Sequence, residues 1–319
     1  SYLNHWQPNL DPHPNRVPRQ RRRPNQSLTP SRRVVCLARC KGSLVSSKDD
    51  GKRMTTDDLT VEFETFQREL RSFILRMTAS VQDAEDIVQD TYLKARSKLS
   101  TFRGESSIKT WVFSIASNLA RDLLRSKQRW PENVTDICRE EALGNRQFFQ
   151  EALQIHESSP QGKFEIKEHI AFCFTCVSKS LPLEQHLVLL LKEVYGFKVK
   201  EIAQIIDQTD AMVEYYLHVG RSRMIEIFDR RCSLINKQGV CYQCTELNGI
   251  FNPKQKEQEE LAKIEMARDA ANKGKEELFD LRMKILQELD PFESGAAELQ
   301  LHHLEHNRQV MEKYLEEDQ

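Results

Sequence analysis

The stretch that decides the fold is DAEDIVQDTYLKARSKLSTFRGESSIKTWVFSIASNLARDLLRSKQR, which covers residues 83–129. It opens with carboxylates, continues with an apolar and aromatic middle, and ends with a basic amphipathic segment. In this stretch and in residues 61–77, apolar side chains recur at the spacing of a helix that buries one face. We therefore predict a compact helical domain over residues 57–130.

Serine residues mark the expected helix starts in this domain. Ser80 precedes a run of carboxylates, an arrangement typical of a helix N-terminus. The segment 101–107 contains a glycine and is predicted to be a loop. Ser106 or Ser107 can then cap a long helix that continues to Lys127.

A second helical block is predicted over residues 180–230. Its pattern indicates one helix over 183–195, a short helix over 199–206, a turn at 207–209, and a longer helix over 211–228. This order is typical of a helix-turn-helix unit. Because no segment shows the alternation of a strand, the fold class is predicted to be all-α.

The remaining segments are more polar. Residues 131–179 are expected to be a linker, polar and mixed up to about residue 165 and helical after it. Residues 231–254 form a cysteine-containing segment, and residues 255–319 a charged helical extension. Pro291 divides this extension into two helices, which we expect to form a hairpin or a flexible arm.

The charge of the chain is unevenly distributed. Its formal net charge is -1, but residues 1–53 hold 12 Lys/Arg against 3 Asp/Glu, so the rest is acidic. This proline-rich start has no helical or strand period and is expected to be disordered. The chain begins with Ser1 and its first methionine is Met54. Residues 1–53 are therefore interpreted as translated upstream sequence or a dispensable leader, with a basic nucleic-acid-binding arm as the alternative.

Residues 61–129 resemble region 2 of sigma-70 family factors of the short extracytoplasmic-function (ECF) type. The resemblance rests on the strings DAEDIVQDTY, FRGESS and KTWVFSIASNLARDLLR. It implies a three-helix bundle within a two-domain alternative sigma factor. Such a factor binds core RNA polymerase, recognises the minus-ten and minus-thirty-five promoter elements and promotes transcription initiation.

The carboxylates at the start of this block fall on one face of a helix, because they are three and four positions apart. The resemblance implies that this face docks on the clamp coiled coil of core polymerase. The alternative is an ordinary solvated acidic face. The predicted polymerase-binding residues are Glu85, Asp86, Gln89 and Asp90.

The end of the same block carries a basic helical face that suits DNA. Cationic side chains can follow phosphates, and Asn118 can read a base edge. The resemblance implies recognition of the minus-ten element, with one base flipped into a pocket near the 102–107 loop. Taken singly, Phe102 and Trp111 fit a core role at least as well. The predicted DNA-binding residues of this block are Phe102, Lys109, Asn118, Arg121, Arg125 and Lys127.

Residues 181–228 resemble region 4 of the same family, whose recognition helix enters the major groove of the minus-thirty-five element. The sequence departs from the family pattern here, because Asp210 and Glu214 would lie near phosphates. A helix-turn-helix that contacts protein is therefore the alternative. The predicted DNA-binding residues of this helix are Tyr215, Tyr216, His218, Arg221 and Arg223.

Cysteines outside the first segment have the spacing of a metal site. His169, Cys173 and Cys176 share one helical face, and this string also resembles the zinc motif of anti-sigma factors. A second C-x-x-C string follows the helix-turn-helix, and tetrahedral zinc favours such sets. The candidate ligands are His169, Cys173, Cys176, Cys232, Cys241 and Cys244. Buried structural cysteines and a redox dithiol are the alternatives, and a histidine cluster at 302–306 is expected to be solvated.

These patterns favour a non-enzymatic function. No nucleophile–base pair, glycine-rich phosphate loop or paired carboxylate set is evident. The expected partners are core RNA polymerase, promoter DNA and an anti-sigma factor, and the only expected cofactor is zinc, with a structural or regulatory role. The expected location is the cytoplasm, because no segment is apolar enough to enter a membrane. The competing class is a metal- or thiol-sensing helix-turn-helix regulator that acts through protein contacts.

Overall fold

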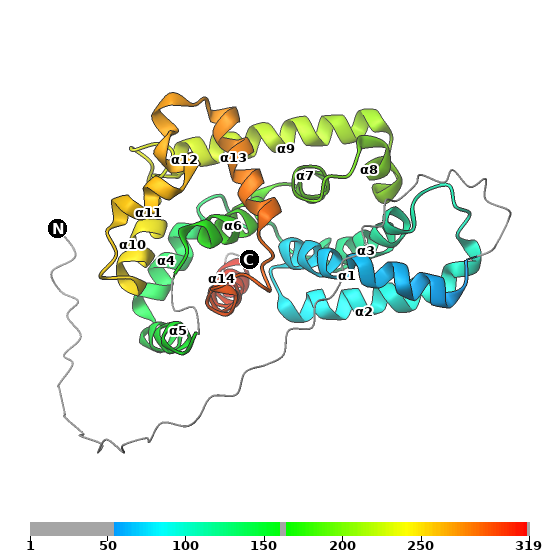
Figure 1. Cartoon of the computed structure of the whole chain (residues 1–319), viewed down its shortest axis with the longest axis horizontal. Coiled ribbons are helices and arrows are strands. Elements are labelled where there is room, and N and C mark those ends of the chain that lie inside the picture. The colour runs from blue at the N-terminus through cyan, green and yellow to red at the C-terminus, as the bar shows by residue number, and fades with distance from the viewer. Residues whose placement is uncertain (1–53, 160–163, 318–319) are drawn as a thin grey trace, which may run out of the picture. The chain divides into compact units, whose positions relative to one another are not determined.

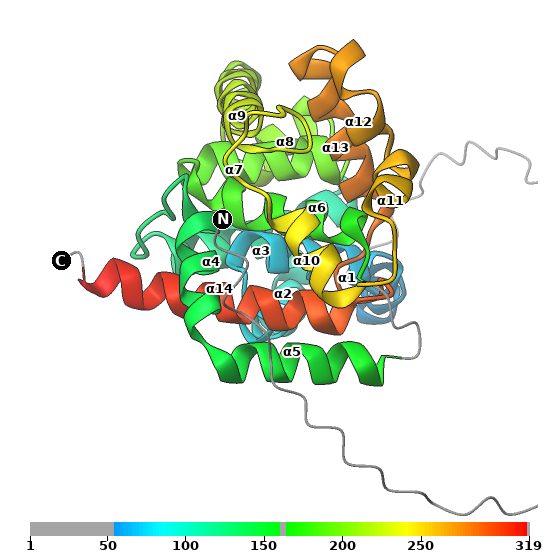
Figure 2. The same cartoon turned by 90° about the vertical axis from the view of Figure 1, so that its left-hand side faces the viewer.

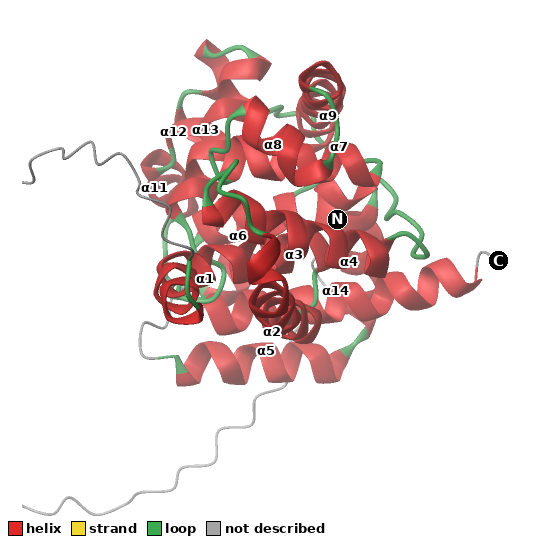
Figure 3. Cartoon of the chain, turned by 90° about the vertical axis from the view of Figure 1, so that its right-hand side faces the viewer, coloured by secondary structure: helices red, strands yellow, loops and turns green. Residues whose placement is uncertain are grey.

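The computed structural model describes residues 54–159 and 164–317, all of which belong to one compact unit, Arg53–Gln319. Within these residues the secondary structure is helical, with one isolated β-bridge between Cys232 and Cys241 and no strand (Figure 3). The predicted all-α fold class is confirmed. The expectations for residues 1–53 lie outside the described residues. No described helix is both long enough and apolar enough to cross a membrane.

The first three helices form the predicted bundle. They are α1 (Thr56–Thr78), α2 (Val81–Lys98) and α3 (Ile108–Leu124), with a 3-10 turn at Leu99–Thr101. Ser80 caps α2 by accepting a hydrogen bond from the Asp83 amide, and Ser107 caps α3 in the same way from Thr110. Both caps satisfy amide groups that the first helical turn leaves unpaired. The helix that was expected to reach Lys127 ends at Leu124.

The helix-turn-helix is confirmed. It consists of α7 (Leu183–Leu189), a π-helical turn (Leu190–Val194), α8 (Val199–Ile206) and α9 (Asp210–Arg231). Asp207 takes a left-handed conformation at φ 55°, which ends α8. Thr209 then caps α9 by accepting a hydrogen bond from the Met212 amide.

The segment up to residue 165, expected to be a polar linker, contains two helices that the sequence analysis did not identify. The chain forms α4 (Val134–Gly144) and α5 (Arg146–Ser158) before α6 (Ile166–Val177) and a 3-10 turn at Ser178–Ser180. Both missed helices are polar on most of their surface and bury only a short stripe, such as Phe148, Phe149 and Ala152 of α5. So narrow an apolar stripe gives a weak periodic signal.

The C-terminal extension is part of the folded unit and is neither a hairpin nor a flexible arm. Its elements are α10 (Gln243–Phe251), α11 (Glu257–Lys263), α12 (Glu265–Arg268), a 3-10 turn (Ala270–Asn272), α13 (Lys275–Glu288) and α14 (Ala297–Glu317). Helix α13 packs on α6 and α9, whereas α14 packs on α4, α5 and α6 (Figures 1 and 2).

One large core joins the first bundle to the helix-turn-helix. Helix α3 packs on α8, and the fully buried ring of Phe113 lies 5.4 Å from Phe73 in α1. On its other side the same ring lies 4.8 Å from Phe197, which precedes α8. Aromatic pairs at this separation contribute beyond the area they bury. Phe113 therefore belongs to both blocks at once.

Phe113→Ala should lower the free energy of unfolding by about 3–5 kcal/mol, because it removes a buried ring and leaves a cavity. Leu93→Ala is the matched control, since Leu93 is 50% exposed on α2 and should change the free energy by less than about 0.5 kcal/mol. Urea denaturation of both variants measures the difference. Equal effects would contradict the shared core.

Candidate nucleic-acid interface and thiol cluster

The predicted acidic face is exposed along α2. Ser80 sets the start of the helix, and Ile87 and Val88 bury the opposite side, so the carboxylates point away from the core. Glu85 accepts a hydrogen bond of 2.6 Å from Arg71. The guanidinium of Arg71 also lies 3.6 Å from the centre of the Phe292 ring. The exposed residues are those predicted: Glu85, Asp86, Gln89 and Asp90.

Arg121 of α3 is buried, although it was predicted to face DNA. It is 8% exposed and donates two hydrogen bonds of 3.0 and 3.1 Å from Nη2 to the carboxylate of Glu184 in α7. Its Nη1 also donates to the backbone oxygen of Ile206, at 3.4 Å. A desolvated arginine of this kind is held by its carboxylate and is not presented to solvent.

The other predicted residues of this block are partly or fully exposed. Lys109 forms an ion pair of 2.7 Å with Glu69, and Arg125 forms one of 3.2 Å with Asp122 of its own helix. Asn118 is exposed, and its Oδ1 accepts a hydrogen bond of 3.2 Å from Nη1 of Arg121. Lys127 forms an ion pair of 3.8 Å with Glu312 of α14. The ring centres of Phe102 and Trp111 lie 5.2 Å apart.

Helix α9 presents a mixed surface. Tyr215, His218 and Arg223 are exposed, while Tyr216 and Arg221 are half-buried. Its acidic residues Asp210 and Glu214 are exposed as well. The recognition helix therefore keeps the unusual charge that its sequence indicates.

The arginines of α9 are paired with carboxylates from other segments. Arg221 forms an ion pair of 3.0 Å with Glu193 and a second with Asp280 of α13. Arg223 pairs with Glu132, before α4, at 2.8 Å. Glu132 also accepts from Arg230. The exposed and half-buried arginines of this helix thus each have a carboxylate partner.

All six cationic residues predicted to bind DNA are thus paired with carboxylates, and five of the six pairs reach outside the residue's own helix. The partners in α7, α13 and α14 were not identified from the sequence, because no periodic or local pattern links positions so far apart. The pairs are Lys109–Glu69, Arg121–Glu184, Arg125–Asp122, Lys127–Glu312, Arg221–Glu193/Asp280 and Arg223–Glu132.

Four of the six candidate metal ligands lie near one another. Burial raises the pKa of the Cys244 thiol well above its ordinary value, and the neighbouring thiols of Cys232, Cys173 and Cys241 raise it further. Burial raises the pKa of Cys173 in the same way, with Cys241 and Cys232 adding to the effect. All four are free thiols.

The other two candidates have different neighbours. Cys176 accepts a hydrogen bond from Asn307 Nδ2 at 3.7 Å, and Cys138 donates to the backbone oxygen of Asn307. His169 is buried beside Phe164 and Phe172, and burial lowers its pKa to about 3. Among the described side chains, no three or more His, Cys, Asp or Glu residues are arranged to hold a metal ion.

The expectation that the histidine cluster is solvated is wrong for His303. Its ring is buried, and Nδ1 lies 2.7 Å from the backbone oxygen of Leu299. His302 and His306 both stack on Phe148 of α5, with ring centres 5.0 and 4.0 Å away. These contacts arise because α14 packs along α5 (Figure 2).

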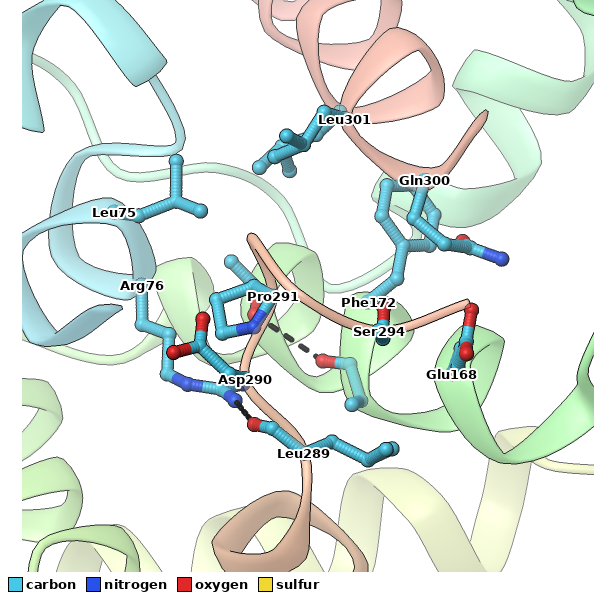
Figure 4. A pocket seen from close by; sticks show the side chains of 13 residues that line it. Leu75, Arg76, Glu168, Phe172, Leu289, Asp290, Pro291, Ser294, Gln300 and Leu301 are labelled. Atoms are coloured by element: carbon cyan, nitrogen blue, oxygen red, sulfur yellow. Dashed lines mark hydrogen bonds between the residues drawn. The ribbon is translucent and has the colours of Figure 1, made fainter. Parts of the chain in front are cut away.

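A small, mainly apolar pocket lies between α1, α6 and the segment that joins α13 to α14 (Figure 4). Arg76 of α1 is fully buried at its edge and donates a hydrogen bond of 3.0 Å to the backbone oxygen of Leu289. Glu168 accepts from the Ala296 amide at 2.9 Å. A cation placed against the carbonyl end of α13 is stabilised there, so this contact fixes the extension to the first bundle.

Comparisons with known proteins agree with both halves of this arrangement. The family model of sigma-70 region 2 matches residues 63–130, and that of sigma-70 region 4 matches residues 172–224. These ranges cover most of α1–α3 and most of α6–α9.

Curated relatives extend the match across the two blocks. The ECF RNA polymerase sigma factor SigG of Mycobacterium tuberculosis strain H37Rv is 30% identical over 177 residues, covering 52% of this chain. The ECF RNA polymerase sigma-E factor of Salmonella typhimurium strain LT2 is 30% identical over 142 residues, covering 44% of this chain and 71% of the relative. The chain spans only about half (48%) of the length of SigG.

A solved structure of the sigma factor RpoE in complex with the anti-sigma factor NepR, from Bartonella quintana, is 20% identical. It covers 54% of this chain and 98% of its own, with a TM-score of 0.35. A likeness this low adds nothing to the assignment.

The described residues form a helical protein with an exposed acidic helix in one block and a helix-turn-helix in the other. The family matches and the curated relatives identify the protein family. The chain belongs to the sigma-70 family of RNA polymerase sigma factors, in its ECF group.

Glu184→Gln should lower the free energy of unfolding by about 1–2 kcal/mol, because the largely desolvated guanidinium of Arg121 then has only a neutral partner. Asp122→Asn is the matched control. It breaks the exposed pair with Arg125 and should change the free energy by less than about 0.5 kcal/mol. Urea denaturation at low salt measures the free energy of unfolding of both variants. If Glu184→Gln leaves it unchanged, the Arg121–Glu184 pair does not hold the two blocks together.

Proposed function

We propose that the protein is an alternative sigma factor that binds core RNA polymerase, recognises minus-ten and minus-thirty-five promoter elements and promotes transcription initiation. The observation that carries this proposal is the presence of both sigma-70 regions in one chain, on α1–α3 and on the helix-turn-helix. The role is regulatory and non-enzymatic, and it is exercised in the cytoplasm, where the polymerase works.

The acidic face of α2 is the proposed polymerase contact. Glu85, Asp86, Gln89 and Asp90 are exposed together on a helix that the bundle holds rigidly on its opposite side. A rigid, one-signed surface suits a partner of opposite charge, since such complementarity speeds association and fixes orientation. Within this face Glu85 is tied to Arg71, so Asp86 and Asp90 carry the more accessible charge.

The proposed DNA contacts fall into two groups. Asn118, Arg125, Tyr215, His218 and Arg223 are exposed in the described conformation, although Arg125 pairs with Asp122 and Arg223 with Glu132. A second group of cations is engaged by carboxylates of other segments: Arg121 by Glu184, and Arg221 by Glu193 and Asp280.

We infer that promoter binding by both groups of residues together requires α3 to separate from α7 and α8. Arg121 cannot reach a phosphate while Glu184 and the Ile206 carbonyl hold its guanidinium in a buried site. Polymerase and DNA together supply the free energy for this opening, because each binds the open arrangement better than the closed one. The described structure is then the closed, stored form of the factor.

The double substitution Asp86→Lys/Asp90→Lys should weaken binding to core RNA polymerase by about tenfold or more, because it reverses the charge of the proposed contact face. Promoter-dependent transcripts from core polymerase on a genomic template library should fall in parallel. Binding is measured by fluorescence anisotropy with labelled protein, and transcripts by sequencing of run-off products.

Glu157→Lys is the control, since Glu157 is an exposed carboxylate near the end of α5, outside both sigma-70 regions. It should leave both readouts unchanged. If wild-type protein directs no promoter-dependent transcripts from core polymerase, the sigma-factor proposal is wrong, and a regulator that acts through protein contacts takes its place. If the charge reversal leaves binding intact, the α2 contact is wrong.

A further inference from the structure

We propose that Cys173, Cys232, Cys241 and Cys244 form a four-thiolate zinc site that ties α6 to the segment following α9. The proposal is independent of the polymerase and promoter contacts. It also selects four ligands from the six candidates that the sequence offers, and it excludes His169 and Cys176.

The first support is the backbone geometry around Cys232 and Cys241. The chain leaves α9 at Cys232 and returns so that these two cysteines form an isolated parallel β-bridge. The Cys241 amide donates to the Arg231 oxygen at 2.9 Å, and the Ser233 amide donates to the Cys241 oxygen at 3.2 Å. Two cysteines on adjacent, hydrogen-bonded backbone segments place their sulfur atoms within reach of one ion.

Gly239 shows how tightly this loop is closed. A Cβ atom at Gly239 would lie 2.7 Å from the backbone carbon of Cys232 and 2.7 Å from the Ser233 nitrogen. Only glycine lets the returning chain approach so closely. The loop between Cys232 and Cys241 is therefore built to hold the two cysteines together, as the tight turns of structural zinc sites do.

The third and fourth thiols come from flanking helices. Cys244 lies at the start of α10, three residues beyond Cys241, and Cys173 lies on α6, on which α10 packs. Cys232 and Cys244 also pack on one apolar cluster that contains residues of α6, α12 and α13. An apolar shell of this kind excludes competing water from a metal site.

The guanidinium of Arg282 lies beside the thiol cluster. Arg282 of α13 donates from Nη2 to Cys232 Sγ at 3.4 Å, while its guanidinium lies 3.7 Å from the centre of the Phe228 ring. Zinc with four thiolates carries a net charge of about −2, so a buried arginine that donates to one sulfur would stabilise it.

The two excluded candidates have their own partners. Cys176 is fully buried and is bonded by Asn307 of α14, which also accepts from Cys138. His169 lies between aromatic rings. Both residues therefore serve the packing of α6 against α14 and the surrounding aromatic residues, whereas Cys173 serves the cluster near α10.

The proposal includes a rearrangement of side chains. In the described part of the chain the thiols do not yet surround a common point. Zinc binding would rotate the cysteine side chains toward one centre while the bridge, the Gly239 turn and the α6–α10 contact keep their backbones in place. A two-cysteine redox switch would use only a pair of these thiols and would leave the other two without a role.

The test measures metal in the purified full chain by elemental analysis. We expect about one zinc per chain, lost in Cys173→Ser, Cys232→Ser, Cys241→Ser and Cys244→Ser. Cys138→Ser and Cys176→Ser are matched controls, because these buried thiols lie outside the cluster, and both should keep the zinc. Circular dichroism checks that each variant is folded.

A second measurement does not depend on the variants folding. Titration of wild-type protein with an organomercurial should release the zinc after about four thiols have reacted, and cobalt substitution should give the visible absorption of a tetrahedral tetrathiolate ion. The proposal is overturned if wild-type protein binds neither zinc nor cobalt, or if Cys176→Ser loses the metal while Cys241→Ser keeps it.

Discussion

The ion pair between the buried Arg121 and the partly exposed Glu184 is the interaction on which the described arrangement depends. It joins α3 of the first bundle to α7 of the helix-turn-helix, and the aromatic contact between Phe113 and Phe197 joins α3 to the segment before α8. Removing the carboxylate is costly, because the guanidinium is largely desolvated and would lose its charged partner. The same guanidinium is a predicted DNA contact, so packing and promoter binding compete for one side chain.

The C-terminal extension pairs in the same way with two other cationic residues that are predicted to bind DNA. Asp280 of α13 pairs with Arg221 in the recognition helix, and Glu312 of α14 pairs with Lys127 after α3. Arg76 of α1 meanwhile binds the carbonyl end of α13. The excess of acidic residues outside the first 53 positions thus has a structural counterpart, because acidic residues of the extension cover basic positions of both sigma-70 regions.

Local patterns made much of the fold predictable. The bundle and the helix-turn-helix were foreseen because their apolar stripes are wide and because Ser80 and Ser107 mark helix starts. Helices α4 and α5 were missed since each buries only a few side chains. The burial of Arg121 and His303 was missed for a different reason. Their partners, Glu184 and the aromatic surface of α5, are brought to them only by tertiary packing, which spacing along one helix does not reveal.

The most direct test of the closed arrangement is a distance between the two blocks in solution. Fluorescent labels on non-natural amino acids at Val61 of α1 and Lys200 of α8, both exposed, would report it by single-molecule energy transfer. The account predicts one short-distance population for the free protein and a longer distance in the complex with core polymerase and promoter DNA. Glu184→Gln should raise the long-distance population of the free protein. An identical distance in free and promoter-bound protein would contradict the account.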